Sequence, residues 1–254
     1  MDSIVSPKVG LQTGDNNKFL RQWFEVNNSK ISYHSKSIAD SLLSGKKWFP
    51  LNKGGSYRKW YGNYDYVVNW ENDGYEMKHF CWPNGKQRSV IRNPNYYFRE
   101  AITWSDITSG DFSIRYRKNG SIHETSGMSA FDIPEQSNLI YILGLMNSKV
   151  SNYVLKIINP TIHLKTGNFA QFPVLKSDLL NIDSTVKRAI EIAKIDWDSQ
   201  EISWNFCEND LIRNKLSTIE SSVIAENNIL FFTFRGPPYI ICNKYVPNYS
   251  NGRI

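Results

Sequence analysis

Hydrophobic and polar residues follow two different periods along this 254-residue chain. Between residues 62 and 118, strand-forming residues predominate, and Phe112–Tyr116 alternates apolar with polar positions, which indicates β-strands. Turn-forming sequences at Asn72–Gly74 and Lys118–Gly120 interrupt these strands. Residues 1–30 predict a strand–loop–strand opening around a glycine- and Asx-rich turn.

The period changes after residue 138. From Asn138 to Ile158 apolar residues recur at helical spacing, at Leu139, Leu143, Met146, Val150, Tyr153, Val154 and Ile157. Asn159–Pro160 ends this long helix, because proline disfavours helical backbone in the residue before it. A second helix is predicted at about residues 184–195, with Ser184 as its N-cap and one apolar face made of Val186, Ala189, Ile190 and Ala193.

These elements predict an α+β fold, in which a β-rich domain packs against the long helix as a scaffold and a helical C-terminal extension follows. We assign residues 1–176 to the β-rich domain and residues 177–254 to the helical extension and a poorly assignable tail. From about Asn205, polar helix-like sequence alternates with the apolar run 229–232 and a turn at 236–238. That stretch does not read as part of the preceding domain.

Positive charge is concentrated in one segment. The chain has 30 Lys and Arg against 24 Asp and Glu, and residues 46–118 hold 13 Lys and Arg against 7 Asp and Glu, so the whole net charge of +6 lies there. The same segment holds 5 of the 8 Trp. Clustered cations beside planar side chains suit a polyanion with flat bases. The alternative interpretation is a β-rich core with a solvated basic rim.

The cysteines and the N-terminal sequence indicate in which cellular compartment the protein is expected. Cys81, Cys207 and Cys242 are scattered, and an odd number without a CxxC pair supports neither a disulfide framework nor a cysteine-rich zinc site. The sequence after Met1 lacks the basic and apolar regions of a signal peptide, and the apolar stretches are shorter than a membrane span. We therefore expect a cytoplasmic protein without a membrane partner.

Catalytic motifs are incomplete. Asn93–Tyr96 approaches the Asn-Pro-Pro-Tyr signature with which amino-methyltransferases grip an exocyclic amine, but the second proline is missing, and no glycine-rich loop after a strand offers an S-adenosylmethionine site. Gly45–Lys46 lacks the other residues of a P-loop. The four histidines are isolated, and the carboxylates of Glu71, Asp73 and Glu76 are typical of a solvated turn. We predict no catalytic residue, no metal site and no cofactor in this chain.

Several long blocks of sequence resemble one family. The first is Gly-Leu-Gln-Thr-Gly-Asp-Asn-Asn-Lys-Phe at residues 10–19. Further blocks follow in the order expected of the family, at Trp48–Gly62, Val67–Gly74, Tyr97–Ser105, Phe112–Tyr116, Leu145–Lys149, Asn159–Thr161 and Asp196–Ser199. Together they resemble the C-terminal half of PglX, the adenine-specific DNA methyltransferase family of BREX phage-defence systems, which is related to type IIG restriction-modification enzymes. The resemblance covers roughly residues 5–206.

In that family this region is the target-recognition part, whereas cofactor binding and methyl transfer reside upstream. The resemblance therefore implies a DNA-binding target-recognition module of an N6-adenine DNA methyltransferase that lacks the catalytic half. Whether the chain alone is an enzyme stays open. The implied partners are double-stranded DNA and a methyltransferase catalytic domain or other defence subunits, with S-adenosylmethionine bound only in the missing catalytic domain.

The expected DNA contacts fall into three groups. Cations would hold phosphates or read base edges, a loop would lie near DNA, and aromatics would stack on a disturbed base. These residues are Lys53, Arg58, Lys59, Arg92, Arg99 and Arg115; Thr13, Asp15 and Asn16; and Trp60, Tyr61 and Trp104. For all three aromatics the alternative role is core packing.

A rival function is a protein-interaction module. The same surface would then dock on a methyltransferase or another defence subunit, or bind an acidic phage protein. A salt titration distinguishes the two functions. For DNA binding, the logarithm of the affinity falls against the logarithm of the salt concentration with a slope of about −0.9 per neutralised phosphate.

Overall fold

The computed structural model describes residues 1–213 except 2, 109, 135, 137 and 176–181. The chain divides into two compact units, residues 1–209 and residues 210–254. Of the second unit, only helix α8 (Asp210–Arg213) is described. The expected features of the tail at 229–232 and 236–238 lie outside the described residues.

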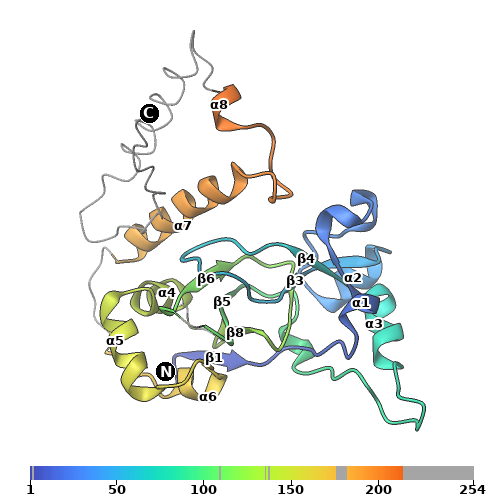
Figure 1. Ribbon diagram of the computed structural model, residues 1–254, viewed down its shortest axis with the longest axis horizontal. Coiled ribbons are helices and arrows are strands. Elements are labelled where there is room, and N and C mark those ends of the chain that lie inside the picture. The colour runs from blue at the N-terminus through green and yellow to red at the C-terminus, as the bar shows by residue number, and fades with distance from the viewer. Residues whose placement is uncertain (2, 109, 135, 137, 176–181, 214–254) are drawn as a thin grey trace, which may run out of the picture. The chain divides into compact units, whose positions relative to one another are not determined.

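Two four-stranded sheets form the framework of the first unit (Figure 1). The first has the order β1-β8-β5-β6, is antiparallel throughout, and is made of β1 (Val5–Lys8), β5 (Ala101–Ser105), β6 (Ile114–Arg117) and β8 (Gly127–Asp132). The second has the order β2-β4-β3-β7, with β3 and β7 parallel, and is made of β2 (Leu20–Gln22), β3 (Trp48–Asn52), β4 (Tyr66–Asn69) and β7 (Ile122–His123).

Helices lie at both ends of this framework (Figure 1). Those near the second sheet are α1 (Asn16–Phe19), α2 (Ile38–Leu43) and α3 (Glu71–Lys78). Those near the first sheet are α4 (Leu139–Met146), α5 (Lys149–Ile158), α6 (Thr166–Ala170) and α7 (Ile182–Asp198). Short 3-10 turns are η1 (Trp23–Glu25), η2 (Asn28–Lys30) and η3 (Pro94–Tyr96). Helices beside mixed sheets confirm the predicted α+β class. Within the described part of the chain, no helix has the length and apolar character needed to cross a bilayer.

The core contains many of the large aromatic side chains that the structure describes. Strand β3 is buried along its whole length, because β4 and β7 pair with its two edges and other elements cover its faces. Around it, Phe49 and Phe98 meet edge to face with ring centroids 5.6 Å apart, and Trp70 and Tyr97 meet in the same way at 5.3 Å. Aromatic pairs prefer this geometry because the positive ring edge meets the negative ring face.

The single helix predicted over residues 138–158 is wrong, because two helices, α4 and α5, occupy the segment. Asn147 ends α4, and its side chain binds both backbone groups of Ile114 on β6, accepting from the N–H at 3.2 Å and donating to the oxygen at 2.9 Å. Ser148 then caps α5 by accepting from the N–H of Ser151 at 3.1 Å. Apolar spacing continues across this break, so periodicity alone did not reveal it.

Helix α7 exceeds the predicted range of 184–195, since it runs from Ile182 to Asp198. Ser184 therefore lies inside the helix and is not its N-cap. The predicted apolar face is confirmed, with Val186 and Ala189 buried and Ile190 and Ala193 packed against Tyr61, Tyr64 and Trp197.

The turn predicted at Asn72–Gly74 is confirmed, because its three residues have φ values of 50°, 57° and 68°. Gly74 is required there, since a Cβ would lie 2.6 Å from the indole of Trp70.

A candidate nucleic-acid interface

The loop Gly10–Asn16 is fastened along its length to two distant segments. Leu11 donates its N–H to the His123 oxygen at 3.0 Å, which ties the loop to β7. Gln12 and Val90 exchange two backbone hydrogen bonds, both 2.8 Å long. The hydroxyl of Ser89 donates to the Thr13 oxygen at 2.6 Å. The loop is therefore held in place by β7 on one side and by the irregular segment that contains Ser89 and Val90 on the other.

Arg88 is held by the far end of this loop. Its Nε donates to the Gly14 oxygen at 3.0 Å, and its guanidinium lies 3.5 Å from the carboxylate of Asp15. Asp15 also caps α1 by accepting from the N–H of Lys18 at 3.1 Å. Thr13 is buried and donates to the exposed Asn16 at 2.6 Å. One carboxylate thus both caps a helix and orients an arginine.

Further cations lie around the same loop. Arg92 is exposed and lies 3.5 Å from the hydroxyl of Thr125, which in turn donates to the Leu11 oxygen at 3.0 Å. The ammonium of Lys53 lies 3.8 Å from Glu124, beside Thr125.

Tyr96 contacts two further cations. The Lys8 ammonium and the exposed Arg99 guanidinium each lie 5.1 Å from its ring centroid. A hydrogen bond with Ser6 and the charges of Lys8 and Arg99 lower the pKa of the Tyr96 hydroxyl. We call Lys8, Lys53, Arg88, Arg92 and Arg99 the basic region.

Three of these five cations, Arg88, Arg92 and Arg99, lie in a segment of sequence that contains no acids. Residues 77–99 include five Lys and Arg and no Asp or Glu; the five are Lys78, Lys86, Arg88, Arg92 and Arg99. The carboxylates that meet them come from outside this segment, as Asp73 does for Lys78 at 2.5 Å. A surplus of fixed positive charge of this kind attracts polyanions.

A second group of predicted contacts lies beneath α4 and α7. Arg58 lies 4.8 Å from the centroid of the Trp197 ring, 3.8 Å from Asp196, and donates to Gln200 at 3.3 Å. Lys59 donates to the Asn147 oxygen at 2.7 Å, at the end of α4. Both cations are half-buried and hold helices in place in this conformation.

Trp60, Tyr61 and Arg115 are buried near these cations. Trp60 pairs through its backbone with β6, and Tyr61 packs on Tyr64 with ring centroids 5.0 Å apart. Arg115 is 1% exposed and donates to the Arg58 oxygen and the Ser105 hydroxyl, both at 3.4 Å. Burial, then the nearby charge of Arg117, lowers the pKa of Arg115 to about 9, so it stays charged at neutral pH.

Trp104 occupies a third place. Its ring stacks on Phe169 of α6 with centroids 4.2 Å and planes 11° apart, and its Nε1 donates to the Leu164 oxygen at 2.8 Å. It is fully buried. Its burial, like that of Trp60, matches the core-packing alternative.

The structure therefore separates the twelve expected contacts. Six are joined to the basic region, namely Thr13, Asp15, Asn16, Lys53, Arg92 and Arg99. Those in the α4–α7 area or the core are Arg58, Lys59, Trp60, Tyr61, Arg115 and Trp104. Lys8 and Arg88 also belong to the basic region and were not among the twelve expected contacts. The acid-free segment 77–99 was the sequence signal that could have drawn attention to Arg88.

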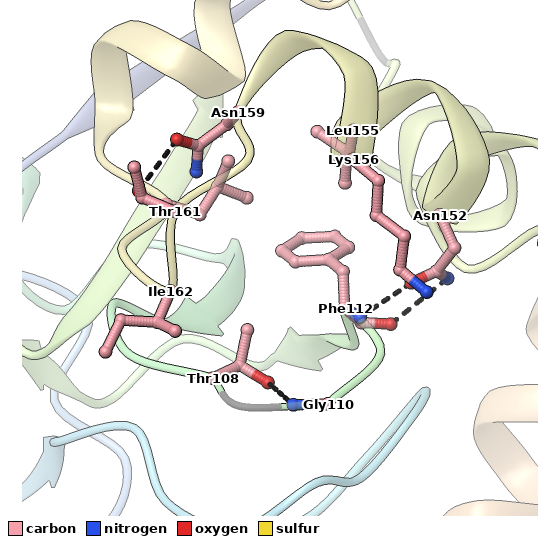
Figure 2. Close-up of a pocket in the computed structure, with 10 residues that line it drawn as sticks. Thr108, Gly110, Phe112, Asn152, Leu155, Lys156, Asn159, Thr161 and Ile162 are labelled. Carbon is pink, nitrogen blue, oxygen red and sulfur yellow. Dashed lines mark hydrogen bonds between the residues drawn. The ribbon is translucent and has the colours of Figure 1, made fainter.

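A small pocket lies elsewhere, between α5, the loop 107–112 and the segment 159–164 (Figure 2). The side-chain amide of Asn152 binds both backbone groups of Phe112, accepting from the N–H at 2.6 Å and donating to the oxygen at 3.3 Å. Lys156 pairs with Asp111 at 3.0 Å. These polar groups fasten the loop to α5. Among the described residues, no group of three His, Cys, Asp or Glu could hold a metal ion.

Comparisons with known proteins identify the relatives of the chain. No protein-family model matches it. The adenine-specific methyltransferase PglX of Lacticaseibacillus casei (strain Zhang) is 38% identical over 215 residues, which are 84% of this chain and 18% of the relative. The adenine-specific methyltransferase BrxX of Escherichia coli O9:H4 (strain HS) is 39% identical over 209 residues, which are 81% of this chain and 16% of the relative. The chain thus spans less than a fifth of the length of these curated relatives. The resemblance stated from the sequence is confirmed, because more than four fifths of the chain is similar to one segment of the PglX and BrxX adenine-specific methyltransferases.

Proposed function

We propose that this chain is a DNA-binding target-recognition module of an N6-adenine DNA methyltransferase in a phage-defence system. Its homology to PglX and BrxX supplies the methyltransferase context. The observation that carries the proposal is the basic region, where cations from separate segments meet around the loop Gly10–Asn16. Lys and Arg hold DNA by neutralising phosphates, and neighbouring amides read base edges.

In this proposal, the module binds DNA and a separate catalytic part transfers the methyl group. Lys53, Arg92 and Arg99 bind phosphates and fix the register of the duplex, while the loop containing Asn16 lies close to the bases. S-adenosylmethionine binding and methyl transfer belong to another part of the methyltransferase. Arg58, Lys59 and Arg115 act as scaffold, because they are engaged beneath α4 and α7.

The test is fluorescence anisotropy with a labelled mixed-sequence duplex, titrated at several salt concentrations. The variant is Arg92→Gln/Arg99→Gln, since both side chains are exposed and neither forms a carboxylate pair within 4.0 Å among the described residues. We expect wild-type binding to be salt-sensitive, and the variant to reduce the slope of log affinity against log salt by about 1.8.

The matched control is Lys149→Gln/Lys187→Gln, which removes two exposed cations from α5 and α7. This control should bind like the wild type. Equal slopes for the two double variants would assign the charge dependence to the net charge of the chain rather than to the basic region. No wild-type binding even at low salt would refute the proposed function.

A second candidate function is docking on a methyltransferase, and α5 gives it a specific observation. Val150, Tyr153 and Ile157 follow one stripe of this helix and are 69%, 71% and 68% exposed. An exposed apolar stripe on a helix suits a protein interface. Substituting all three with Ser should abolish co-purification with a co-expressed methyltransferase while leaving DNA anisotropy unchanged. DNA binding by the module alone, with no co-purification, would exclude this candidate.

A further inference from the structure

The segment Phe80–Arg88 is a β-hairpin that projects beyond α3. Cys81 and Gln87 form an antiparallel bridge, and the N–H of Trp82 donates to the Lys86 oxygen at 2.8 Å. The N–H of Lys86 donates to the Asn84 side chain at 3.0 Å, which closes the turn. Figure 1 shows this part of the chain, just after α3, extending away from both sheets.

The base of the hairpin is rigidly attached. Phe80 meets Phe19 edge to face at 5.2 Å, next to the buried core. The N–H of Arg88 donates to the Phe80 oxygen at 2.8 Å, and the Arg88 side chain is fixed by Gly14 and Asp15 as described above. A projecting element on a fixed base keeps its direction, which lowers the entropy lost when it binds.

The tip presents cationic, aromatic and amide groups to solvent. All seven residues from Cys81 to Gln87 are exposed. Trp82 is 47% exposed, and the guanidinium carbon of Arg88 lies 4.3 Å from its ring centroid. A Cβ added to Gly85 would meet no atom within 4 Å, so the turn is open on that side.

We propose that this hairpin enters the major groove of the DNA duplex. The inference rests on the proposed function, because it names the element that contacts the bases. A major groove about 12 Å wide admits a two-stranded β-ribbon. Lys86 neutralises a phosphate beside the groove, whereas Arg88 stays paired with Asp15 and supports the Trp82 ring. The Asn84 oxygen already accepts from Lys86, and the Gln87 amide nitrogen donates to the Lys78 oxygen at 3.1 Å, so each amide offers its other end to base edges. Trp82 packs against the groove wall.

Cysteine protection tests the contact directly. Cys81 and Cys207 are both exposed, so each reacts with iodoacetamide in the free protein, and peptide mass spectrometry follows them separately. We expect a saturating mixed-sequence duplex at low salt to slow alkylation of Cys81 several-fold and to leave Cys207 unchanged. Lys86→Gln should reduce the salt slope of DNA binding by about 0.9, whereas the control Lys187→Gln should not change it.

The groove is tested with a second duplex. Glucosylated 5-hydroxymethylcytosine fills the major groove, so a duplex that contains it should bind several-fold more weakly than the unmodified one. Salt-sensitive DNA binding with equal alkylation of Cys81 in the presence and absence of DNA would overturn the hairpin contact and leave the proposed function standing. Protection of Cys81 with equal affinity for both duplexes would overturn the groove assignment. No binding to either duplex would overturn the hairpin contact and the proposed function together.

Discussion

Arg117 stacks on Tyr64 in the interior, with the guanidinium carbon 3.8 Å from the ring centroid. Arg117 is buried and donates to the Leu51 oxygen at 3.0 Å, but its Nε and Nη1 have no hydrogen-bond partner among the residues that the structure describes. Asp65 is the nearby carboxylate, and burial raises its pKa although Arg117, Arg58 and Arg115 act in the opposite direction. For Asp65, the cost of burying its charge therefore exceeds the attraction of the three arginines.

The first prediction concerns this buried charge. Arg117→Met keeps an aliphatic stem against Tyr64 and removes a desolvated cation, so the free energy of unfolding should fall by less than about 1 kcal/mol or should rise. Tyr64→Ala, which removes the ring, should cost about 3–5 kcal/mol. Urea unfolding measures both. A loss above about 3 kcal/mol for Arg117→Met would show that the hydrogen bond to Leu51 and the attraction to Asp65 outweigh the cost of burying the guanidinium.

The second prediction concerns pH. Burial lowers the pKa of His123 to about 3, whereas an unfolded histidine has a pKa near 6.5. Because the pKa is lower in the folded state, the unfolded state takes up a proton first as the pH falls. The free energy of unfolding therefore has its full value above pH 6.5 and decreases as the pH falls towards 3. At pH 5 the loss should be about 2 kcal/mol.

His123→Phe provides the comparison, because His123 lies between the rings of Tyr97 and Phe131. Urea unfolding at pH 7 and pH 5 should show a stability difference between wild type and variant that shifts by about 2 kcal/mol in favour of the variant at the lower pH. A constant difference would contradict the prediction, and would mean that His123 protonates within the folded protein.

The third prediction concerns Gly14, which has φ +75° and whose added Cβ would lie 2.7 Å from the Arg88 oxygen. Gly14→Ala should cost more than about 2 kcal/mol and weaken DNA binding, because Arg88 must move. Gly45→Ala is the control, since Gly45 has φ +59° with nothing within 4 Å, and it should cost only about 1 kcal/mol. If urea unfolding shows that Gly14→Ala and Gly45→Ala lower the free energy of unfolding equally, the loss comes from the positive φ angle and not from the contact between the new Cβ and the Arg88 oxygen.

The fourth prediction concerns α7. Trp197 is buried against Tyr61 and Tyr64, so Trp197→Ala should cost about 3–5 kcal/mol, while the exposed Ile195→Ala should change stability by less than about 0.5 kcal/mol. The folded Trp197→Ala protein should keep its affinity for duplex DNA in anisotropy, because the basic region lies on other segments. A folded variant that no longer binds DNA would place Arg58 and Lys59 in the interface.

The sequence predicted local structure correctly where a single residue type determines the backbone conformation or the buried face of a helix. Gly74 marks a left-handed turn because an added side chain would strike Trp70, and α7 shows its apolar face at Val186 and Ala189. The break between α4 and α5 was not predictable from periodicity, because Asn147 ends the helix through bonds to Ile114, which is 33 residues away.

What the sequence determined by itself is the α+β class, the relationship to PglX and BrxX, and the location of the excess charge. The tertiary structure decided which of these cations face solvent. Arg115 and Arg92 look alike in sequence, yet Arg115 is buried on β6 and Arg92 is exposed beside Thr125. Charge is a property of a residue, but its exposure depends on packing between segments far apart in the chain, which local patterns do not encode.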